Sequence, residues 1–139
     1  MQGDGHPLRE IGVVESPLRD RDAAPLQGDE GAPDAWIAID PKYAEALDGV
    51  RPGARLIVLS WLDRADRQVL KVHPRGDESR TRLGVFATRS PDRPNPIGLH
   101  PVEVLAVESG RIHVRGLEAI DGTPVIDLKP ELPSRREER

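Results

Sequence analysis

The stretch GVFATRSPDRPNPIGL, residues 84–99, is the most constrained part of this 139-residue sequence. We expect its apolar beginning to be a short strand and the remainder to be a loop. Pro91, Pro94 and Pro96 fix the backbone φ angle at their own positions and push the preceding residues toward extended or turn geometry. They also lack backbone donors, so we expect a rigid loop that is rich in unpaired carbonyl groups.

Three polar side chains on this loop can recognise a ligand. Arg89 and Arg93 offer forked hydrogen-bond donors, and Asn95 offers an amide. These groups suit a small polar ligand or a phosphate, whereas the alternative interpretation is an ordinary proline-rich turn with solvated arginines. No catalytic residue is assigned from the sequence, and Arg89 and Asn95 are the candidates.

The composition limits the class of protein. The length fits one domain with one modest core. A net charge of −4 argues against binding of nucleic acid by bulk charge, although residues 71–93 carry a local charge of +3 and residues 1–50 carry −7. The absence of cysteine excludes disulfides, thiolate metal sites and cysteine nucleophiles. Without a signal-peptide pattern or an apolar run of membrane-spanning length, we expect a cytoplasmic protein with no membrane partner.

Hydrophobic alternation predicts a mainly β fold, a small antiparallel β-barrel-like domain with one short helix and long loops. The helix is expected over residues 41–48, with Asp40 as its N-cap and a proline at its first position. The expected strands are residues 9–15, 35–40, 55–61, 68–73, 101–107, 111–115 and 125–128.

Two hairpins are expected among these strands. Residues 55–61 are expected to pair with residues 68–73, and residues 101–107 with residues 111–115 across Ser109-Gly110.

The ends of the chain and one long connection are expected to lie outside the core. We predict a disordered N-terminus over residues 1–8, a single domain over residues 9–132 and a charged tail over residues 133–139. Residues 18–33 carry prolines, glycines and charges without periodicity, which predicts a long surface loop.

Motifs of metal-dependent and nucleophilic enzymes are absent from the sequence. It contains no HExxH, GxSxG, GxxxxGK[ST] or strand-to-helix GxGxxG pattern. His73, His100 and His113 have no ligand spacing and are expected to lie at the surface or to form hydrogen bonds. We therefore expect no metal site, and His100 is the histidine that adjoins the loop.

Two paired motifs carry a family resemblance. FATRSPDRPNPIGL is followed by DGTPVIDLKP at residues 121–130, and IGVVESP at residues 11–17 and the triplet Pro25-Leu26-Gln27 add to the match. In this order and spacing the sequence resembles the TsaA-like (TrmO) family of S-adenosylmethionine-dependent methyltransferases. The resemblance implies a small β-barrel-like fold, a homodimer, S-adenosyl-L-methionine as cofactor, and N6-methylation of threonylcarbamoyladenosine in the anticodon loop of tRNA.

The resemblance also implies which residues contact the cofactor. They are Pro25, Leu26, Gln27, Asp63, Arg64, Arg89, Leu99, Asp121, Gly122, Thr123 and Pro124. Asp121 can accept from a ribose or an ammonium, and Leu99 can cover an adenine face. Thr123 and Gln27 offer further hydrogen bonds. An ordinary turn is the alternative interpretation of Asp121-Gly122.

The chain departs from the usual family pattern at several positions. Leu26 stands where relatives have arginine, Arg55 where they have histidine, and Glu131 where they have tyrosine. A second family histidine is absent near Asp63. Together with the net negative charge, these departures reduce the contacts available for the phosphates and a splayed base of tRNA.

Three functions follow as alternatives. The first is a methyltransferase that acts on tRNA. The second is the same catalyst acting on a small molecule. The third is a non-catalytic module that binds S-adenosylmethionine.

Overall fold

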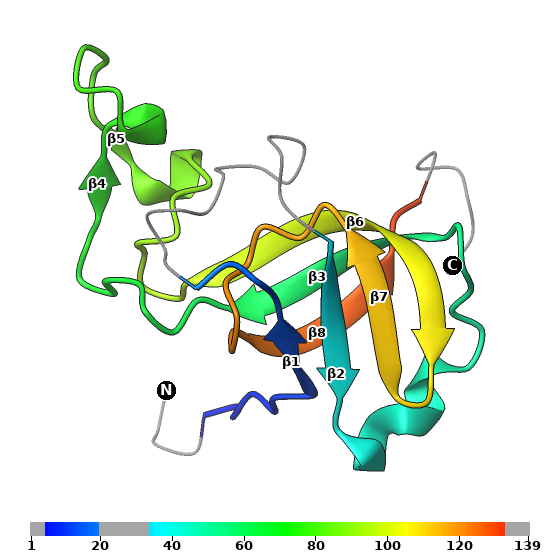
Figure 1. The fold of residues 1–139 in the computed structure, drawn as a ribbon. Coiled ribbons are helices and arrows are strands. Elements are labelled where there is room, and N and C mark those ends of the chain that lie inside the picture. The colour runs from blue at the N-terminus through cyan, green and yellow to red at the C-terminus, as the bar shows by residue number, and fades with distance from the viewer. Residues whose placement is uncertain (1–4, 20–33, 133–139) are drawn as a thin grey trace.

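Alternating aliphatic residues build a closed antiparallel barrel in this protein (Figure 1). A computed structural model describes residues 5–19 and 34–132 of the chain. The barrel strands are β1 (Gly12–Glu15), β2 (Ala35–Ile39), β3 (Arg55–Trp61), β6 (Ile97–Glu108), β7 (Arg111–Arg115) and β8 (Pro124–Pro130). Their order around the barrel is β1-β2-β7-β6-β3-β8, and every neighbouring pair is antiparallel. The expected mainly β barrel is confirmed.

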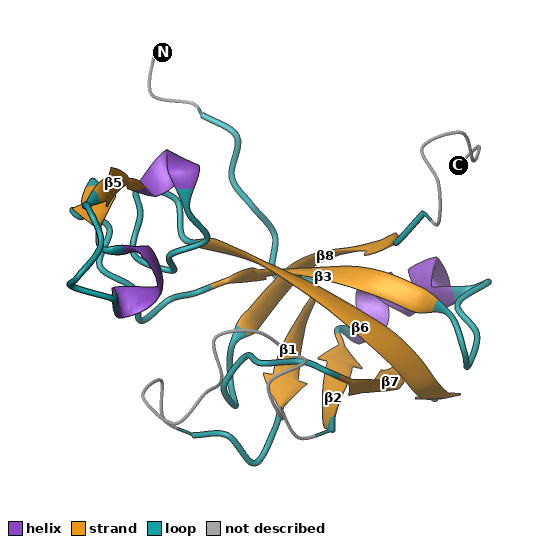
Figure 2. Ribbon diagram, turned by 90° about the horizontal axis from the view of Figure 1, so that it is seen from above, coloured by secondary structure: helices purple, strands orange, loops and turns teal. Residues whose placement is uncertain are grey.

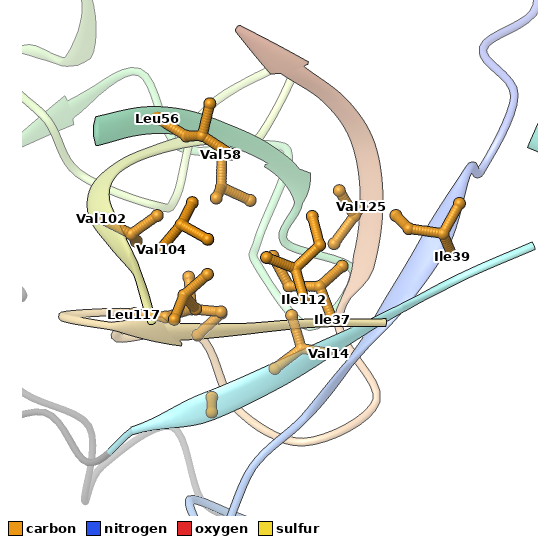
Figure 3. Close-up of a cluster of buried hydrophobic side chains, with 13 residues drawn as sticks. Val14, Ile37, Ile39, Leu56, Val58, Val102, Val104, Ile112, Leu117 and Val125 are labelled. Carbon is orange, nitrogen blue, oxygen red and sulfur yellow. The ribbon is translucent and has the colours of Figure 1, made fainter. Parts of the chain in front are cut away.

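The core fills the inside of this barrel (Figure 3). In β7, Ile112 and Val114 have no exposed surface, while Arg111, His113 and Arg115 alternate with them on the outside. This two-residue period is what a strand with one buried face requires. The expected hairpin of β6 and β7 is confirmed, although β6 begins earlier in the sequence than predicted.

The other expected hairpin is wrong. β3 does not pair with residues 68–73, because β6 and β8 occupy its two edges. Within residues 68–73, only Lys71–Val72 forms a strand, β4, which pairs with β5 (Leu83–Gly84) in a separate two-stranded sheet. Sequence proximity suggested the pairing, but β6 and β8 carry fully buried residues such as Val102 and Val125, whereas residues 68–73 carry none.

The short helix is present as a 3-10 helix, η3 (Pro41–Leu47). The Asp40 carboxylate accepts from the Lys42 backbone amide at 3.1 Å, as an N-cap does. Two further 3-10 turns, η4 (Pro74–Gly76) and η5 (Val85–Ala87), lie outside the barrel. The strand expected at the start of residues 84–99 is therefore mostly wrong, because the chain turns into η5 directly after β5.

Residues 62–96, which we call the arm, project from one end of the barrel and carry β4, β5, η4 and η5 (Figures 1 and 2). Among the arm side chains whose burial the structure describes, only Val85 and Pro96 are buried. No helix in the described ranges is long and apolar enough to cross a membrane. The predictions for residues 1–4, 20–33 and 133–139 fall outside the described residues.

Candidate functional site

Four connecting segments meet at the end of the barrel from which the arm projects. They follow β1, follow β3, precede β6 and precede β8. The backbone of Leu62, just after β3, donates to the carbonyl of Pro96, just before β6, at 2.8 Å. The backbone of Asp121 donates to the carbonyl of Leu18 at 2.6 Å, which joins the segments after β1 and before β8. Segments that are far apart in the sequence thus form one surface.

Hydrogen bonds fasten the proline-rich loop to the segment after β3. The Asp92 carboxylate accepts from the Asp66 amide at 2.8 Å. Arg67 donates through Nε to the Pro94 carbonyl at 2.7 Å and through its terminal nitrogen to Asn95 Oδ1 at 3.1 Å. The side chain of Asn95 was a candidate from the sequence, and its amide oxygen Oδ1 already accepts this internal hydrogen bond.

The two loop arginines have different roles. The guanidinium of Arg93 donates to the carbonyls of Val85, Thr88 and Ser90, the last at 3.2 Å, and folds the loop around itself. The expectation that the loop carbonyls are unpaired is therefore wrong for several of them. Arg89 is exposed and makes no hydrogen bond or ion pair within the described part of the chain. Of the two, Arg89 is the one available to a ligand.

The Asp121-Gly122 turn precedes β8 and is hydrogen-bonded to the segment that follows β1. Asp121 Oδ1 accepts from the Ser16 amide at 2.9 Å, and Oδ2 lies 3.5 Å from an Arg19 nitrogen. Gly122 adopts a φ of +86°, which favours glycine, and Thr123 is buried with its hydroxyl donating to the Ile120 carbonyl at 2.7 Å. The motif is thus a turn, and its carboxylate stands at the site surface.

The remaining predicted cofactor residues are placed as follows. Asp63 and Arg64 are exposed, and Arg64 donates to the Arg19 carbonyl at 3.3 Å. Leu99 is 40% exposed on the outer side of β6, and Pro124 begins β8. Pro25, Leu26 and Gln27 lie outside the described residues.

Sequence reasoning missed an apolar surface beside these residues. A shallow hollow of about 410 Å³ is lined by Leu8, Glu10, Trp61, Pro124 and Ile126. The Arg67 guanidinium lies 5.1 Å from the centre of the Trp61 ring. The sequence of β3 could have indicated that Trp61 lies on an apolar outer surface, because β3 has apolar residues on both of its faces.

The arm also exposes apolar side chains that the sequence did not single out. Phe86 is 85% exposed, Leu70 65% and Leu83 39%. Arg82 and Arg89 of the arm are also exposed. Residues able to hold a metal do not cluster anywhere in residues 5–19 and 34–132.

The sequence and fold are similar to those of known proteins. Residues 13–135 match the family model described as the tRNA-methyltransferase O N-terminal domain. A probable S-adenosyl-L-methionine-binding protein of Methanothermobacter thermautotrophicus is 50% identical over 124 residues, 88% of each chain. An S-adenosyl-L-methionine-binding protein of Archaeoglobus fulgidus is 48% identical over 126 residues, covering 91% of this chain and 89% of the relative.

Solved structures show the same fold. The crystal structure of TrmO from Pseudomonas aeruginosa has a TM-score of 0.75 and 32% identity, and the match covers 93% of this chain and 57% of that one. A second TrmO crystal structure has a TM-score of 0.75 and 34% identity, with 93% and 58% covered. The present chain therefore spans less than three fifths of these TrmO chains.

Proposed function

The chain belongs to the family of the tRNA-methyltransferase O N-terminal domain, and we propose that it is an S-adenosylmethionine-dependent methyltransferase. One observation carries this proposal. The described cofactor residues implied by the sequence, although they come from separate segments, lie at or beside one end of the barrel. Relatives that match along almost the whole chain are named as S-adenosyl-L-methionine-binding proteins, which supports the same ligand here.

The side chains at this end fit the chemical groups of S-adenosylmethionine. Arg89 is an exposed fork suited to the carboxylate of the cofactor. The exposed face of Leu99 suits the adenine, and the carboxylates of Asp63 and Asp121 suit ribose hydroxyls or the ammonium. The ring of Trp61 and backbone carbonyls of the site suit the sulfonium, which has no proton to donate. When bound, the cofactor supplies an activated methyl group.

The residues of this chain then have two tasks, to align the acceptor with the cofactor and to exclude water. The proline-rich loop, held by Arg93 and Arg67, keeps the backbone beside Arg89 fixed before any ligand arrives. Such preorganisation reduces the entropy lost on binding.

A second copy of the chain is the proposed partner. The hollow lined by Trp61 and Ile126 includes only Pro124 of the expected cofactor residues, so the other described ones stand on an open surface. Ile97 and Leu99 are each 40% exposed on the outer side of β6, next to Trp61. An apolar outer face next to an open site favours a homodimer that completes the site. Light scattering with cofactor present tests this, and a monomeric mass at tens of micromolar (~10⁻⁵ M) would contradict it.

The proposed methyl acceptor is tRNA. The arm supports this choice, because exposed Phe86 can stack on an unpaired base while Arg82 and Arg89 can reach phosphates. A small-molecule acceptor is the second candidate, and the departures from the family pattern at Leu26, Arg55 and Glu131 favour it. A non-catalytic binding module is the third, because the curated relatives are named for binding alone.

Two measurements test these proposals. Titration calorimetry should show binding of S-adenosylmethionine or S-adenosylhomocysteine, and the absence of binding at millimolar concentration (~10⁻³ M) would contradict the function. Incubation of the protein with cofactor and bulk tRNA should add the mass of one methyl group to a modified nucleoside. Binding without any methylated nucleoside would contradict the tRNA acceptor and leave the other two candidates.

A further inference from the structure

A chain of three polar side chains lies in the barrel wall at the site end. Ser60 Oγ is 2.7 Å from His100 Nε2, and His100 Nδ1 is 2.9 Å from Glu118 Oε1. Ser60 and His100 are 0% and 4% exposed, and the Glu118 side chain is 19% exposed. With an ionised carboxylate, which only accepts, and a neutral imidazole, Nδ1 donates to Glu118 and Nε2 accepts from the Ser60 hydroxyl. The hydrogen bonds therefore run in one direction, from Ser60 to Glu118.

Gly98 makes room for this chain. It lies opposite Ser60 in the pairing of β3 with β6. A Cβ atom at position 98 would lie 2.5 Å from both Ser60 Oγ and His100 Nε2. Position 98, within PNPIGL, therefore requires glycine because a larger side chain would collide with the Ser60–His100 hydrogen bond, and not because the backbone turns there.

These three hydrogen-bonded side chains do not form a nucleophilic site, and a gain in folding stability does not explain their presence. Ser60 has no exposed surface, so its hydroxyl cannot attack a substrate. Glu118 Oε2 is buried without a hydrogen-bond partner among the described residues, which is unfavourable for a carboxylate. Apolar side chains of similar volume commonly give equal or greater stability than buried ionic groups. Both ring nitrogens of His100 are nevertheless hydrogen-bonded, and these two bonds join three separate segments in one arrangement.

We propose that Ser60, His100 and Glu118 form a positioning relay that sets the spacing of three segments of the cofactor site. Ser60 is the penultimate residue of β3, close to the segment that enters the arm, His100 lies in β6, and Glu118 lies in the connection to β8. The inference rests on the proposed function, because these segments carry the cofactor residues. The adjoining cofactor residues are Asp63, Leu99 and Asp121.

Relay variants and a matched core variant test the proposal. Ser60→Ala and Glu118→Leu remove the hydrogen bonds, and Glu118→Gln keeps a carbonyl oxygen that can accept from His100 Nδ1. Val104→Ala, at a buried position of β6 outside the relay, is the control for loss of stability. At a temperature where every variant is folded, Ser60→Ala and Glu118→Leu should raise the Kd of S-adenosylhomocysteine about tenfold. Glu118→Gln should raise it less, and Val104→Ala should leave it unchanged even where its melting temperature falls as far.

A second readout needs no ligand. In amide NMR spectra of the ligand-free protein, Glu118→Leu should shift signals from all three segments, including the segment around Asp63, whereas Val104→Ala should not. If the wild type binds no cofactor but these shifts occur, the function is wrong and the relay stands. Normal affinity in Ser60→Ala and Glu118→Leu would overturn the relay and leave the function standing. Shifts confined to the vicinity of Glu118 would also overturn it.

Discussion

The barrel and the arm are built by different forces. The barrel strands bury aliphatic side chains such as Ile37, Val58 and Ile112 completely. The arm buries Val85 but leaves Phe86 85% exposed, and its shape is held by side chains that hydrogen-bond to backbone groups. The barrel therefore has a hydrophobic core of its own, whereas the arm leaves apolar and basic side chains exposed. This difference predicts that substitutions in the barrel lower stability, whereas substitutions of exposed arm residues leave it nearly unchanged.

Removal of a core side chain should have the largest effect on stability. Ile112→Ala leaves a cavity in the barrel and should lower the free energy of unfolding by about 2–5 kcal/mol. Phe86→Ala, on the arm, should change it by at most about 0.5 kcal/mol because the ring is mostly solvated. Urea denaturation of the ligand-free protein measures both values. Equal losses would mean that the arm and the barrel share one core.

The barrel strands could be predicted from the sequence because each strand shows its own alternation of apolar and polar residues. A two-residue period of buried and exposed side chains fixes the strands, and β7 shows it from Arg111 to Arg115. The arm could not be predicted in the same way. Its fold depends on Arg93 and Arg67 reaching carbonyls that no periodicity marks. The relay of Ser60, His100 and Glu118 joins positions 40 and 18 residues apart, so it appeared only once the register of the strands was known.

The candidate site was predicted from motifs, and the structure refines it. The cofactor assignments themselves stay predictions. Thr123 is buried and its hydroxyl already donates to the Ile120 carbonyl, so a hydrogen bond between this hydroxyl and a ligand would have to use its oxygen as the acceptor. Arg89 remains available, and Arg93 does not. Residue types alone could not separate these two arginines, because both lie within the same proline-rich loop.

Substitution of Arg89 should separate binding from stability. Arg89→Ala should leave the melting temperature of the ligand-free protein nearly unchanged, because the side chain has no partner among the described residues. Loss of its charge-assisted contact should weaken S-adenosylmethionine binding by roughly 1.5–3 kcal/mol, at least about tenfold in Kd. Arg89→Lys should restore only part of the affinity, since a point charge does not replace the fork. Normal binding and turnover in Arg89→Ala would show that the arginine is merely solvated.

Substitution of Arg93 should have a smaller effect that is confined to the arm. Arg93→Ala removes the donors to the carbonyls of Val85, Thr88 and Ser90. Because these groups are partly exposed, we expect the free energy of local opening to fall by about 1–2 kcal/mol. Hydrogen exchange should accelerate in residues 85–95 and remain unchanged in β7. Accelerated exchange throughout the barrel would show that the two regions unfold together, and Arg89→Ala serves as the control in the same loop.

The smallest effect concerns a surface turn of the arm. The hydroxyl and the backbone amide of Ser79 donate to the Asp77 carboxylate at 2.6 and 3.0 Å. These two hydrogen bonds hold the pKa of Asp77 below its ordinary value, and the bond from the hydroxyl has the larger effect. A lowered carboxyl pKa stabilises the folded turn above the unfolded-state pKa, and this contribution is lost as the pH falls through the folded-state pKa. The turn should therefore be unchanged between about pH 7 and pH 5 and should loosen only in acid.

An NMR titration of the Asp77 carboxyl carbon measures this directly. Ser79→Ala removes the hydroxyl donor but keeps the backbone amide, so the pKa of Asp77 should rise part of the way toward its ordinary value. The melting temperature at neutral pH should not change, because the carboxylate is fully exposed and the barrel core does not contact it. An unchanged pKa in Ser79→Ala would contradict the role of the hydroxyl. A fall in the melting temperature would instead show that even this turn contributes to the stability of the barrel, and would contradict the separation between a self-sufficient barrel and a locally stabilised arm.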